Sequence, residues 1–275
     1  HHTIYSRFMG TLALDIVGTL TDSSHTIPHT VIERLAEIYE AGWAIMLVTG
    51  RSYRFASEAL FHFPFPYILL VQNGADAIEM PSRAAISHAY LSKSTILAID
   101  PFIPLIVYTG PAYDDQCYYV EERFDATARV YLKKLQGKAT LSLTPIPSFE
   151  QLEQKAFPLI KGIADAATLE RARRELRHLP IEQSHIQDPF FSDRSFLLVT
   201  AHGVDKGRRV IDVMKDRSLS GPIVAAGNDL NDLPLLQIAN KAIAMEGSPQ
   251  ELLGAADVVA PPSTKMGILT ALSSL

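Results

Sequence analysis

Asp15 stands where a carboxylate could attack phosphorus. It follows the apolar residues 12–14 and comes shortly before Gly18 and Thr19. A carboxylate there can form an aspartyl-phosphate, which divides one difficult displacement into two easier ones. Gly18 permits a tight turn in which backbone N–H groups approach phosphoryl oxygens. The alternative is that Asp15 only begins a turn or caps a helix.

Thr49, Gly50 and Arg51 follow a second apolar run. The threonine hydroxyl and the following N–H can bind phosphate oxygens, and Arg51 can add positive charge. For this tripeptide alone, the alternative is an ordinary turn between a strand and a loop.

Lys206 lies at the start of an expected helix in the segment HGVDKGRRV. An ammonium group at a helix N-terminus opposes the helix dipole, so this position calls for a negatively charged partner. A nearby aspartyl-phosphate would be such a partner. The alternative is a solvated lysine at the start of a helix.

Two Asn-Asp pairs follow another apolar run, at Asn228-Asp229 and Asn231-Asp232. Oxygen ligands at this density suit a hard cation such as Mg²⁺, which binds through one or two carboxylates, waters and substrate phosphate. The alternative is an Asx-rich turn that caps the next helix. We interpret the segment as a magnesium site.

The elements that must position these residues are short buried strands alternating with amphipathic helices. This pattern predicts an α/β fold with a doubly wound, Rossmann-like parallel sheet as its core. In such a sheet the polar clusters at the strand ends converge at one edge. A helix is expected from Pro28 to Gly42, and Asp205 is expected to cap another. The expected strands are 11–14, 43–48, 67–71, 195–200, 223–226, 242–245 and 258–260.

The middle of the chain has a different pattern, with proline-rich turns, strands at 105–108, 117–120 and 158–163, and charged helices near 125–135 and 168–179. It predicts an α+β domain inserted into the core. We expect a discontinuous core formed by residues 1–82 and 194–275, and an inserted domain formed by residues 83–193.

Composition excludes several classes of function. The net charge is −5, so there is no basic field for nucleic acid or an anionic membrane. No apolar run is long enough to span a bilayer, and no signal peptide is evident. The single cysteine, Cys117, excludes an intrachain disulfide. We expect a cytoplasmic protein, either a monomer or a weak homodimer.

Taken together and in this order, the blocks DIVGT, LVTGR, GVDKG and GNDLND resemble the haloacid dehalogenase-like hydrolases, in their Cof-type sugar-phosphatase branch. QNGADAI at 72–78 and the C-terminal segment at 242–259 also resemble this branch. The resemblance covers nearly the whole chain and is weakest in the insertion, which it identifies as a large cap that selects the leaving group.

The resemblance also implies roles for individual residues. Asp15 is implied as nucleophile and magnesium ligand, and the backbone carbonyl of Val17 as a further ligand. Thr49 and Lys206 would hold the transferring phosphoryl group. Asn231 would help to orient that group, and Asp232 would complete the metal environment. The implied substrate is a small phosphorylated metabolite.

Two positions depart from the family pattern. Val17 stands where these phosphatases usually carry a second aspartate that acts as general acid and base. Loss of such a proton-transferring group typically lowers the rate by a factor of about 10² to 10⁴. Asn228 occupies the first acidic position of the metal block, with the carboxylate displaced to Asp229. An asparagine can ligate magnesium but adds no negative charge, so either the site binds the ion more weakly or Asp229 or Asp232 takes over as ligand.

Val17 leaves four hypotheses open. The chain is a weakened or specialised phosphatase, best suited to good leaving groups. Alternatively, it is a phosphosugar-binding or regulatory protein that has lost turnover. A third hypothesis is an enzyme with different phosphoryl or phosphonyl chemistry. The fourth is that an aspartate was replaced at this position, deliberately or by accident.

Overall fold

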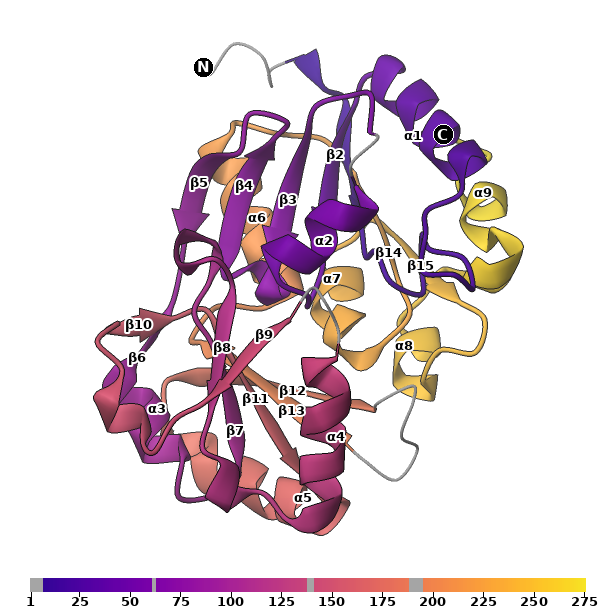
Figure 1. The fold of residues 1–275 in the computed structure, drawn as a ribbon. Helices are drawn as coiled ribbons and strands as arrows, with labels where there is room; N and C mark the ends of the chain where they lie inside the picture. The colour runs from indigo at the N-terminus through magenta and orange to yellow at the C-terminus, as the bar shows by residue number, and fades with distance from the viewer. Residues whose placement is uncertain (1–6, 61–62, 138–140, 188–194) are drawn as a thin grey trace. The chain divides into compact units, whose positions relative to one another are not determined.

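Eight strands form one sheet in the order β16-β15-β14-β1-β2-β3-β4-β5 (Figure 1). Neighbouring strands from β16 to β3 are parallel. β4 pairs antiparallel with β3, and β5 pairs antiparallel with β4. β1, β2, β3 and β14 are buried along their whole length, because helices cover both faces. The predicted α/β fold class is confirmed. The strands are β1 (Gly10–Leu14), β2 (Trp43–Val48), β3 (Tyr67–Val71), β4 (Asp76–Met80), β5 (Ala84–His88), β14 (Ile223–Gly227), β15 (Lys241–Met245) and β16 (Val258–Ala260).

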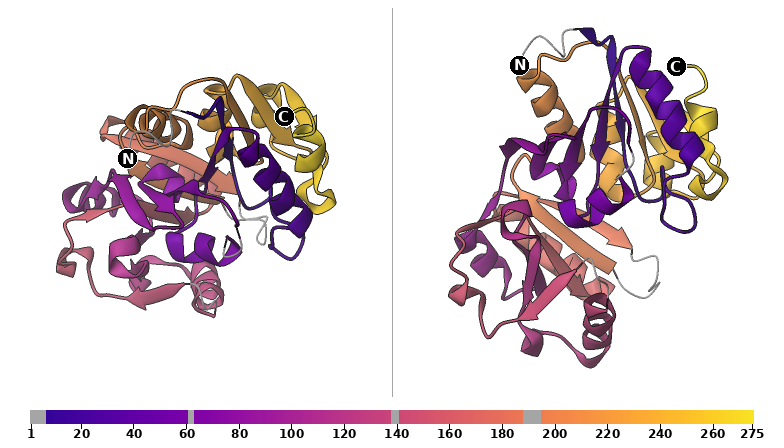
Figure 2. Two further views of the ribbon diagram at one scale, coloured as in Figure 1. Left: turned by 90° about the horizontal axis from the view of Figure 1, so that it is seen from above. Right: turned by 45° about the horizontal axis from the view of Figure 1, so that its top comes forward.

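Helices α1 and α6 lie on opposite faces of this sheet (Figure 2). On the α6 face, Val210 and Val213 of α6 and Leu235 of α7 pack against Ala13 and Met46. The helical segments are α1 (His29–Glu40), α2 (Tyr53–Ala59), α6 (Lys206–Asp216), α7 (Leu233–Gln237), α8 (Gln250–Gly254), α9 (Gly267–Ala271), and the 3₁₀ turns η2 (Gln72–Gly74), η7 (Leu230–Asp232) and η8 (Ser263–Lys265).

The predicted helix ends agree with the structure. α1 begins directly after Pro28, and its chain turns at Gly42, where φ is +100°. α6 begins after Asp205, whose carboxylate accepts a hydrogen bond from the backbone N–H of Arg208 at 2.7 Å. Both ends follow from the local chemistry of turns and caps.

The computed structural model describes residues 7–60, 63–137, 141–187 and 195–275, which divide into two units. The first unit consists of His1–Arg51, Ala56–His88 and Asp205–Leu275, and it contains the eight-stranded sheet. The second consists of Ser52–Phe55 and Ala89–Val204. Each unit has its own buried apolar cluster. In the described part of the chain, no helix has the length and apolar character needed to cross a bilayer.

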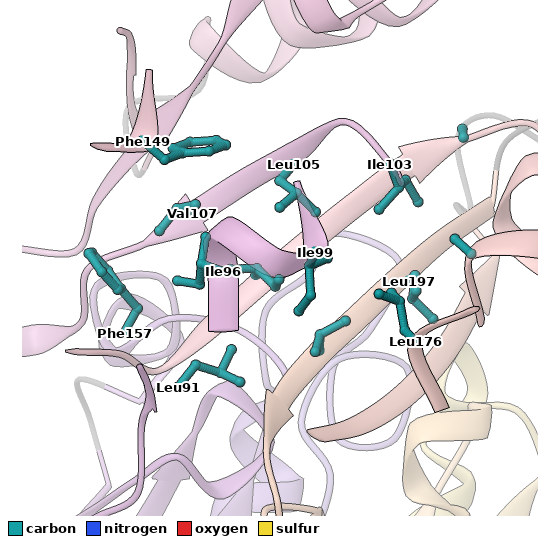
Figure 3. Close-up of a cluster of buried hydrophobic side chains, with 14 of the residues drawn as sticks. Leu91, Ile96, Ile99, Ile103, Leu105, Val107, Phe149, Phe157, Leu176 and Leu197 are labelled. Carbon is teal, nitrogen blue, oxygen red and sulfur yellow. The ribbon is translucent and has the colours of Figure 1, made fainter. Parts of the chain in front are cut away.

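The second unit contains a six-stranded sheet in the order β12-β13-β11-β7-β8-β9 and a short pair formed by β10 and β6. Leu105 and Val107 of β7 pack with Ile96 and Ile99 of α3 (Figure 3). The strands are β6 (Leu91–Ser92), β7 (Leu105–Tyr108), β8 (Gln116–Tyr119), β9 (Ser142–Pro145), β10 (Ala156–Phe157), β11 (Leu159–Ala164), β12 (Ile181–Gln187) and β13 (Ser195–Ala201). The helical segments are α3 (Lys93–Ile99), α4 (Ala126–Gln136), α5 (Ala166–Glu175), η3 (Pro111–Tyr113), η4 (Glu121–Arg123), η5 (Phe149–Gln151) and η6 (Leu176–His178).

Strand β13 belongs to the second unit, whereas the sequence pattern placed residues 195–200 in the core. β13 pairs antiparallel with β11 and β12, and the second unit continues to Val204. At the other junction, β5 pairs with β4, so the first unit extends to His88. An apolar run shows that a strand is buried but not which sheet it joins. The expected boundary between 193 and 194 lies outside the described residues.

Candidate active site

Three of the polar clusters follow neighbouring parallel strands. Asp15 follows β1, Thr49 follows β2, and Asn228 follows β14, which lies beside β1. The backbone N–H of Asp15 donates to Ala226 O of β14 at 3.0 Å, so the parallel pairing of β1 with β14 continues one residue past the end of β1. Because the carboxyl ends of parallel strands meet at one edge, these clusters share the edge where such sheets bind ligands.

Lys206 joins two of the clusters through a buried ion pair. Its Nζ donates to Asp15 Oδ1 at 2.8 Å and to Asp232 Oδ1 at 2.5 Å. The side chains of Lys206 and Asp232 have no exposed surface, and that of Asp15 is 8% exposed. The charged partner that the sequence required for Lys206 is therefore a pair of carboxylates.

The charges in this group shift one another's protonation. Burial raises the pKa of Asp15 to about 7, the negative charge of Asp232 adds to the shift, and the Lys206 ammonium opposes it. Burial alone would lower the pKa of Lys206, but the two carboxylates outweigh it and hold that pKa above its usual value. Lys206 is therefore a fixed positive charge, and Asp15 is the group whose charge state its surroundings can change.

Asp232 uses both of its oxygens inside the protein. Oδ1 accepts from Lys206, and Oδ2 accepts from the backbone N–H groups of Asn228 and Asp229, at 2.9 and 3.1 Å. Asp229 caps η7, its Oδ1 accepting from the N–H of Leu230 at 2.7 Å. Burial raises the pKa of Asp229. In this arrangement Asp232 holds the loop in place, and Asp229 begins the helical turn.

Asp15, Val17 and Asn228 converge on a different point. The end of the Asn228 amide that faces the β1 loop lies 2.7 Å from Asp15 Oδ2 and 3.0 Å from the carbonyl oxygen of Val17. With its nitrogen in this position, the amide donates a hydrogen bond to each oxygen. With its oxygen there, that oxygen lies 3.3 Å from the Thr19 hydroxyl, and three oxygens face one another, an arrangement that a cation between them would stabilise.

The oxygen-facing orientation fits a small divalent cation. Magnesium binds oxygens at 2.0–2.1 Å in octahedral geometry, so neighbouring ligand oxygens lie about 2.9 Å apart. The separations of 2.7 and 3.0 Å are close to this edge length. Within the described residues, no three His, Cys, Asp or Glu side chains gather as metal ligands. The ligand set here would instead be one carboxylate, one backbone carbonyl and one amide.

Gly18 and Thr19 shape the loop around these oxygens. Gly18 has φ of +82°, and a Cβ added to it would lie 2.1 Å from Asn228 Nδ2. Only glycine therefore allows the Asn228 amide to approach the loop so closely. The buried Thr19 hydroxyl donates to Asp15 Oδ2 at 3.2 Å, which leaves Oδ1 as the carboxylate oxygen beside Lys206.

The Thr49-Gly50-Arg51 turn is present after β2. Thr49 is buried, and its hydroxyl accepts from the backbone N–H of Arg51 at 3.0 Å. The Arg51 residue is exposed, so its side chain is open to solvent. Thr49 O accepts from the N–H of Asn73, which connects this turn to the loop after β3.

Asn231 also contacts the loop after β3, which sequence reasoning had not included among the site residues. Its Nδ2 donates to Asn73 Oδ1 at 3.1 Å. Arg209, on α6, donates from Nε to the carbonyl oxygen of Gly74 in the same loop at 2.7 Å. The QNG segment was noted for its family resemblance only. Arg209 is three residues after Lys206, and residues three apart share a helix face, so this spacing is the signal that could have placed Arg209 near the site.

The haloacid dehalogenase-like hydrolase family model matches residues 12–272. The chain belongs to this family. The family, inferred from the ordered sequence blocks, is thereby confirmed, as is the prediction that the chain is a hydrolase.

Relatives of known name and structure are distant in sequence. The pyridoxal phosphate phosphatase YbhA of Escherichia coli (strain K12) is 23% identical over 265 residues, which cover 92% of this chain and 93% of that protein. A haloacid dehalogenase-like hydrolase from B. subtilis superposes with a TM-score of 0.79 at 18% identity, over 97% of this chain and 100% of the other. The subclass IIB sugar phosphatase BT4131 gives a TM-score of 0.76 at 19% identity, over 97% and 98% of the two chains.

Proposed function

We propose that this hydrolase is a magnesium-dependent phosphatase that transfers the phosphoryl group of a small phosphorylated metabolite to Asp15 and then to water. The observation that carries the proposal is the buried Lys206 ammonium, held between Asp15 and Asp232 at the carboxyl edge of the sheet. Two relatives, a pyridoxal phosphate phosphatase and a sugar phosphatase, support a phosphate monoester as substrate.

Asp15 Oδ1 is the oxygen that we assign to the attack on phosphorus. Oδ2 is engaged by Thr19 and faces the Asn228 amide, whereas Oδ1 is bound by Lys206. The reaction forms an oxygen–phosphorus bond at Asp15 and breaks the bond between phosphorus and the leaving oxygen, which departs as an alkoxide and takes its proton from solvent. Water then cleaves the acyl phosphate and regenerates the carboxylate.

Lys206 and Thr49 would stabilise the phosphoryl group during both steps. The ammonium offsets charge on the phosphoryl oxygens, and the threonine hydroxyl follows the adjacent strand. The left-handed φ of Gly18 permits the tight turn through which the backbone of the loop can approach the phosphate.

Asp15 Oδ2, the Val17 carbonyl oxygen and the Asn228 amide oxygen would hold the magnesium ion. When bound, Mg²⁺ supplies positive charge that offsets the repulsion between Asp15 and the incoming phosphate. With one carboxylate in this ligand set, we expect weaker binding of the ion than a site with two would give.

Val17 cannot donate a proton to the leaving group or accept one from water. We therefore expect the chain to favour substrates whose leaving groups need little protonation. A binding or regulatory protein is the second candidate, because Val17 removes a catalytic group and leaves the Asp15–Lys206–Asp232 arrangement in place. In this proposal the second unit acts as the cap that selects the leaving group.

The test is phosphate release from pyridoxal 5′-phosphate, a nitrophenyl phosphate and a panel of sugar phosphates, with and without MgCl₂. We expect Asp15→Asn to abolish release and Val17→Asp to raise it by about tenfold or more. Asp22→Asn is the matched control, because this carboxylate lies in a loop where it bonds Ser24 and Thr26.

The outcomes separate the two candidates. Equal activity of wild type and Asp15→Asn would rule out Asp15 as nucleophile. No turnover on any substrate by wild type, together with magnesium-dependent binding of a sugar phosphate, would establish the binding protein instead.

A further inference from the structure

The loop after β3 has an unusual backbone. Gln72, Asn73 and Gly74 have φ of +52°, +59° and +96°, so three consecutive residues are left-handed and two of them are not glycine. Residues with side chains populate this region sparsely, and it persists only where surrounding contacts hold it. All three residues are buried, although they lie between strands.

Two of the contacts that hold the loop come from the turn after β2. The N–H of Gln72 donates to Arg51 O and the N–H of Asn73 donates to Thr49 O, both at 2.9 Å. The loop is thus bonded to the threonine that we assign to phosphate binding.

The third contact comes from Arg209 on α6. Its Nε donates to Gly74 O at 2.7 Å, one terminal nitrogen donates to Ser87 Oγ at 2.7 Å, and the other lies 3.4 Å from Asp212. A Cβ added to Gly74 would lie 2.6 Å from Arg209 Cβ, so glycine is needed for the arginine to pass. The planar guanidinium can serve acceptors in three directions at once, which an ammonium on a flexible stem cannot reproduce.

The same loop ends at the active site. Asn73 Oδ1 accepts from Asn231 Nδ2, and Asn231 precedes Asp232, which binds Lys206. Lys206 and Arg209 are three residues apart on α6, so the contacts close a ring that starts and ends on one helix. Every contact in this ring lies in the first unit.

We propose that Arg209 is a positioning residue for phosphoryl transfer. It locks the Gln72–Gly74 loop, and the loop fixes the amide plane of Asn231 through Asn73. The inference rests on the proposed function, since Asn231 matters to turnover only if a phosphoryl group binds beside it. Misplacement of a binding group by a small distance can lower a rate about 10²-fold, so an indirect residue can have a measurable effect.

Arg209→Lys tests the proposal, because it keeps the charge and most of the packing but loses the planar fork. We expect kcat for phosphate release to fall about tenfold. Asn231→Ala should lower kcat by a similar factor, and adding Arg209→Lys to it should lower kcat less than twofold further, because the two residues act through one contact. Arg208→Lys is the matched control, since Arg208 is exposed on the same helix.

Hydrogen exchange supplies a readout that needs no turnover. We expect the peptide that contains Gln72–Gly74 to exchange faster in Arg209→Lys than in wild type or Arg208→Lys. Unchanged exchange in Arg209→Lys overturns the proposal, whether or not the wild-type chain releases phosphate. If the wild type is active, two kinetic results also overturn the proposal. One is an unchanged kcat in Arg209→Lys. The other is an equal loss of kcat when Arg209→Lys is added to the wild type and to Asn231→Ala.

Asn73→Gly provides a second route if Arg209→Lys does not fold. Glycine keeps the left-handed backbone but removes the acceptor for Asn231. We expect the same loss of kcat as in Asn231→Ala and no further loss in the double variant. An Asn73→Gly chain with wild-type kcat contradicts the link between the loop and Asn231.

Discussion

Lys206 places one ammonium between two buried carboxylates, so with Asp15 ionised the three groups carry one net negative charge. A phosphate ester brings further negative charge to this point. If a phosphate ester binds here, as we propose, the site needs another positive charge, and the oxygens of Asp15, Val17 and Asn228 are the place that we propose for it. The charge balance of individual residues, more than any one distance, favours a cation here.

Removing the ammonium should destabilise the protein strongly. We expect Lys206→Met to lower the free energy of unfolding by about 3–5 kcal/mol at pH 7.5, because two buried carboxylates lose the positive charge between them. Urea denaturation followed by circular dichroism measures this change. Lys241→Met is the control, since Lys241 bonds the exposed Ser274 and should cost about 0.5 kcal/mol or less. Equal losses in the two variants would mean that the ion pair stabilises nothing.

Asp115 is a buried carboxylate outside this group, in the turn before β8. Its Oδ2 accepts from the N–H of Arg54 at 2.8 Å, and its Oδ1 is buried without a hydrogen-bond partner. Burial raises the pKa of Asp115 above its usual value. Because the folded pKa lies above the unfolded one, its contribution to stability is present at low pH and is lost as pH rises through the folded pKa.

Asp115→Asn should therefore stabilise the protein increasingly with pH. An asparagine keeps an acceptor for Arg54, tolerates the left-handed φ of +51° and carries no charge. We expect the stability gain over wild type to grow from about pH 4 upward and to level off above the folded pKa.

Urea denaturation between pH 4 and 8 measures the gain. Bonding to Ser24 lowers the pKa of Asp22, so Asp22→Asn titrates differently from wild type only below about pH 4 and its stability difference from wild type should be nearly constant across this range. A gain in Asp115→Asn that is constant with pH would show that Asp115 does not titrate in this range.

Helix α6 is the element that connects the parts of the site. It presents Lys206 at its first residue and Arg209 at its fourth, and Asp205 caps it. The cap is a local interaction, yet it fixes where α6 begins and therefore where Lys206 lies. In the second unit, Asp165 caps α5 in the same way, its side chain accepting from the N–H of Thr168 at 2.9 Å.

These two caps form a matched pair for a test. We expect Asp205→Ala and Asp165→Ala each to lower the free energy of unfolding by about 1 kcal/mol. Only Asp205→Ala should also lower kcat, by about tenfold or more, because the residue that follows Asp205 is Lys206. Thermal denaturation and steady-state kinetics on both variants measure the two effects. Similar kcat losses in the two variants would contradict the role of α6 as the positioning element.

At the scale of the whole molecule, the chain contains two units with separate apolar cores. Met46 lies in the core of the first unit, and Phe157 lies in that of the second, both with no exposed surface. Two separate cores allow the units to open independently, because local opening follows the packing of each cooperative region.

Cavity-forming variants should therefore act on one unit at a time. We expect Met46→Ala to lower the opening free energy of the first unit by about 2–5 kcal/mol, and Phe157→Ala that of the second by about 3–5 kcal/mol. Hydrogen exchange measured by mass spectrometry assigns the change to peptides of each unit. Faster exchange in both units from either single variant would show one shared cooperative core.

The sequence by itself determined the strands at 43–48 and 67–71, the helix caps, and the family. These features depend on local chemistry. A buried strand needs an apolar run, a helix start needs a capping oxygen, and a motif retains its residues in order. Val17, which departs from the family pattern, was also evident from the sequence alone.

Only the tertiary structure decided which sheet β13 joins. It also decided which carboxylate oxygens Lys206 binds on Asp15 and on Asp232. Finally, it showed that Asn73 and Arg209 contact the loops of the site. Each of these is a contact between residues far apart in the chain, or a choice between two atoms of one side chain. Long-range contacts and choices between two atoms leave no periodic or compositional signal in the sequence. Packing and charge select the contacting residue or atom only after the strands have paired. Asp15 was identifiable from its neighbours in sequence, but the ammonium that fixes its charge comes from a residue 191 positions away.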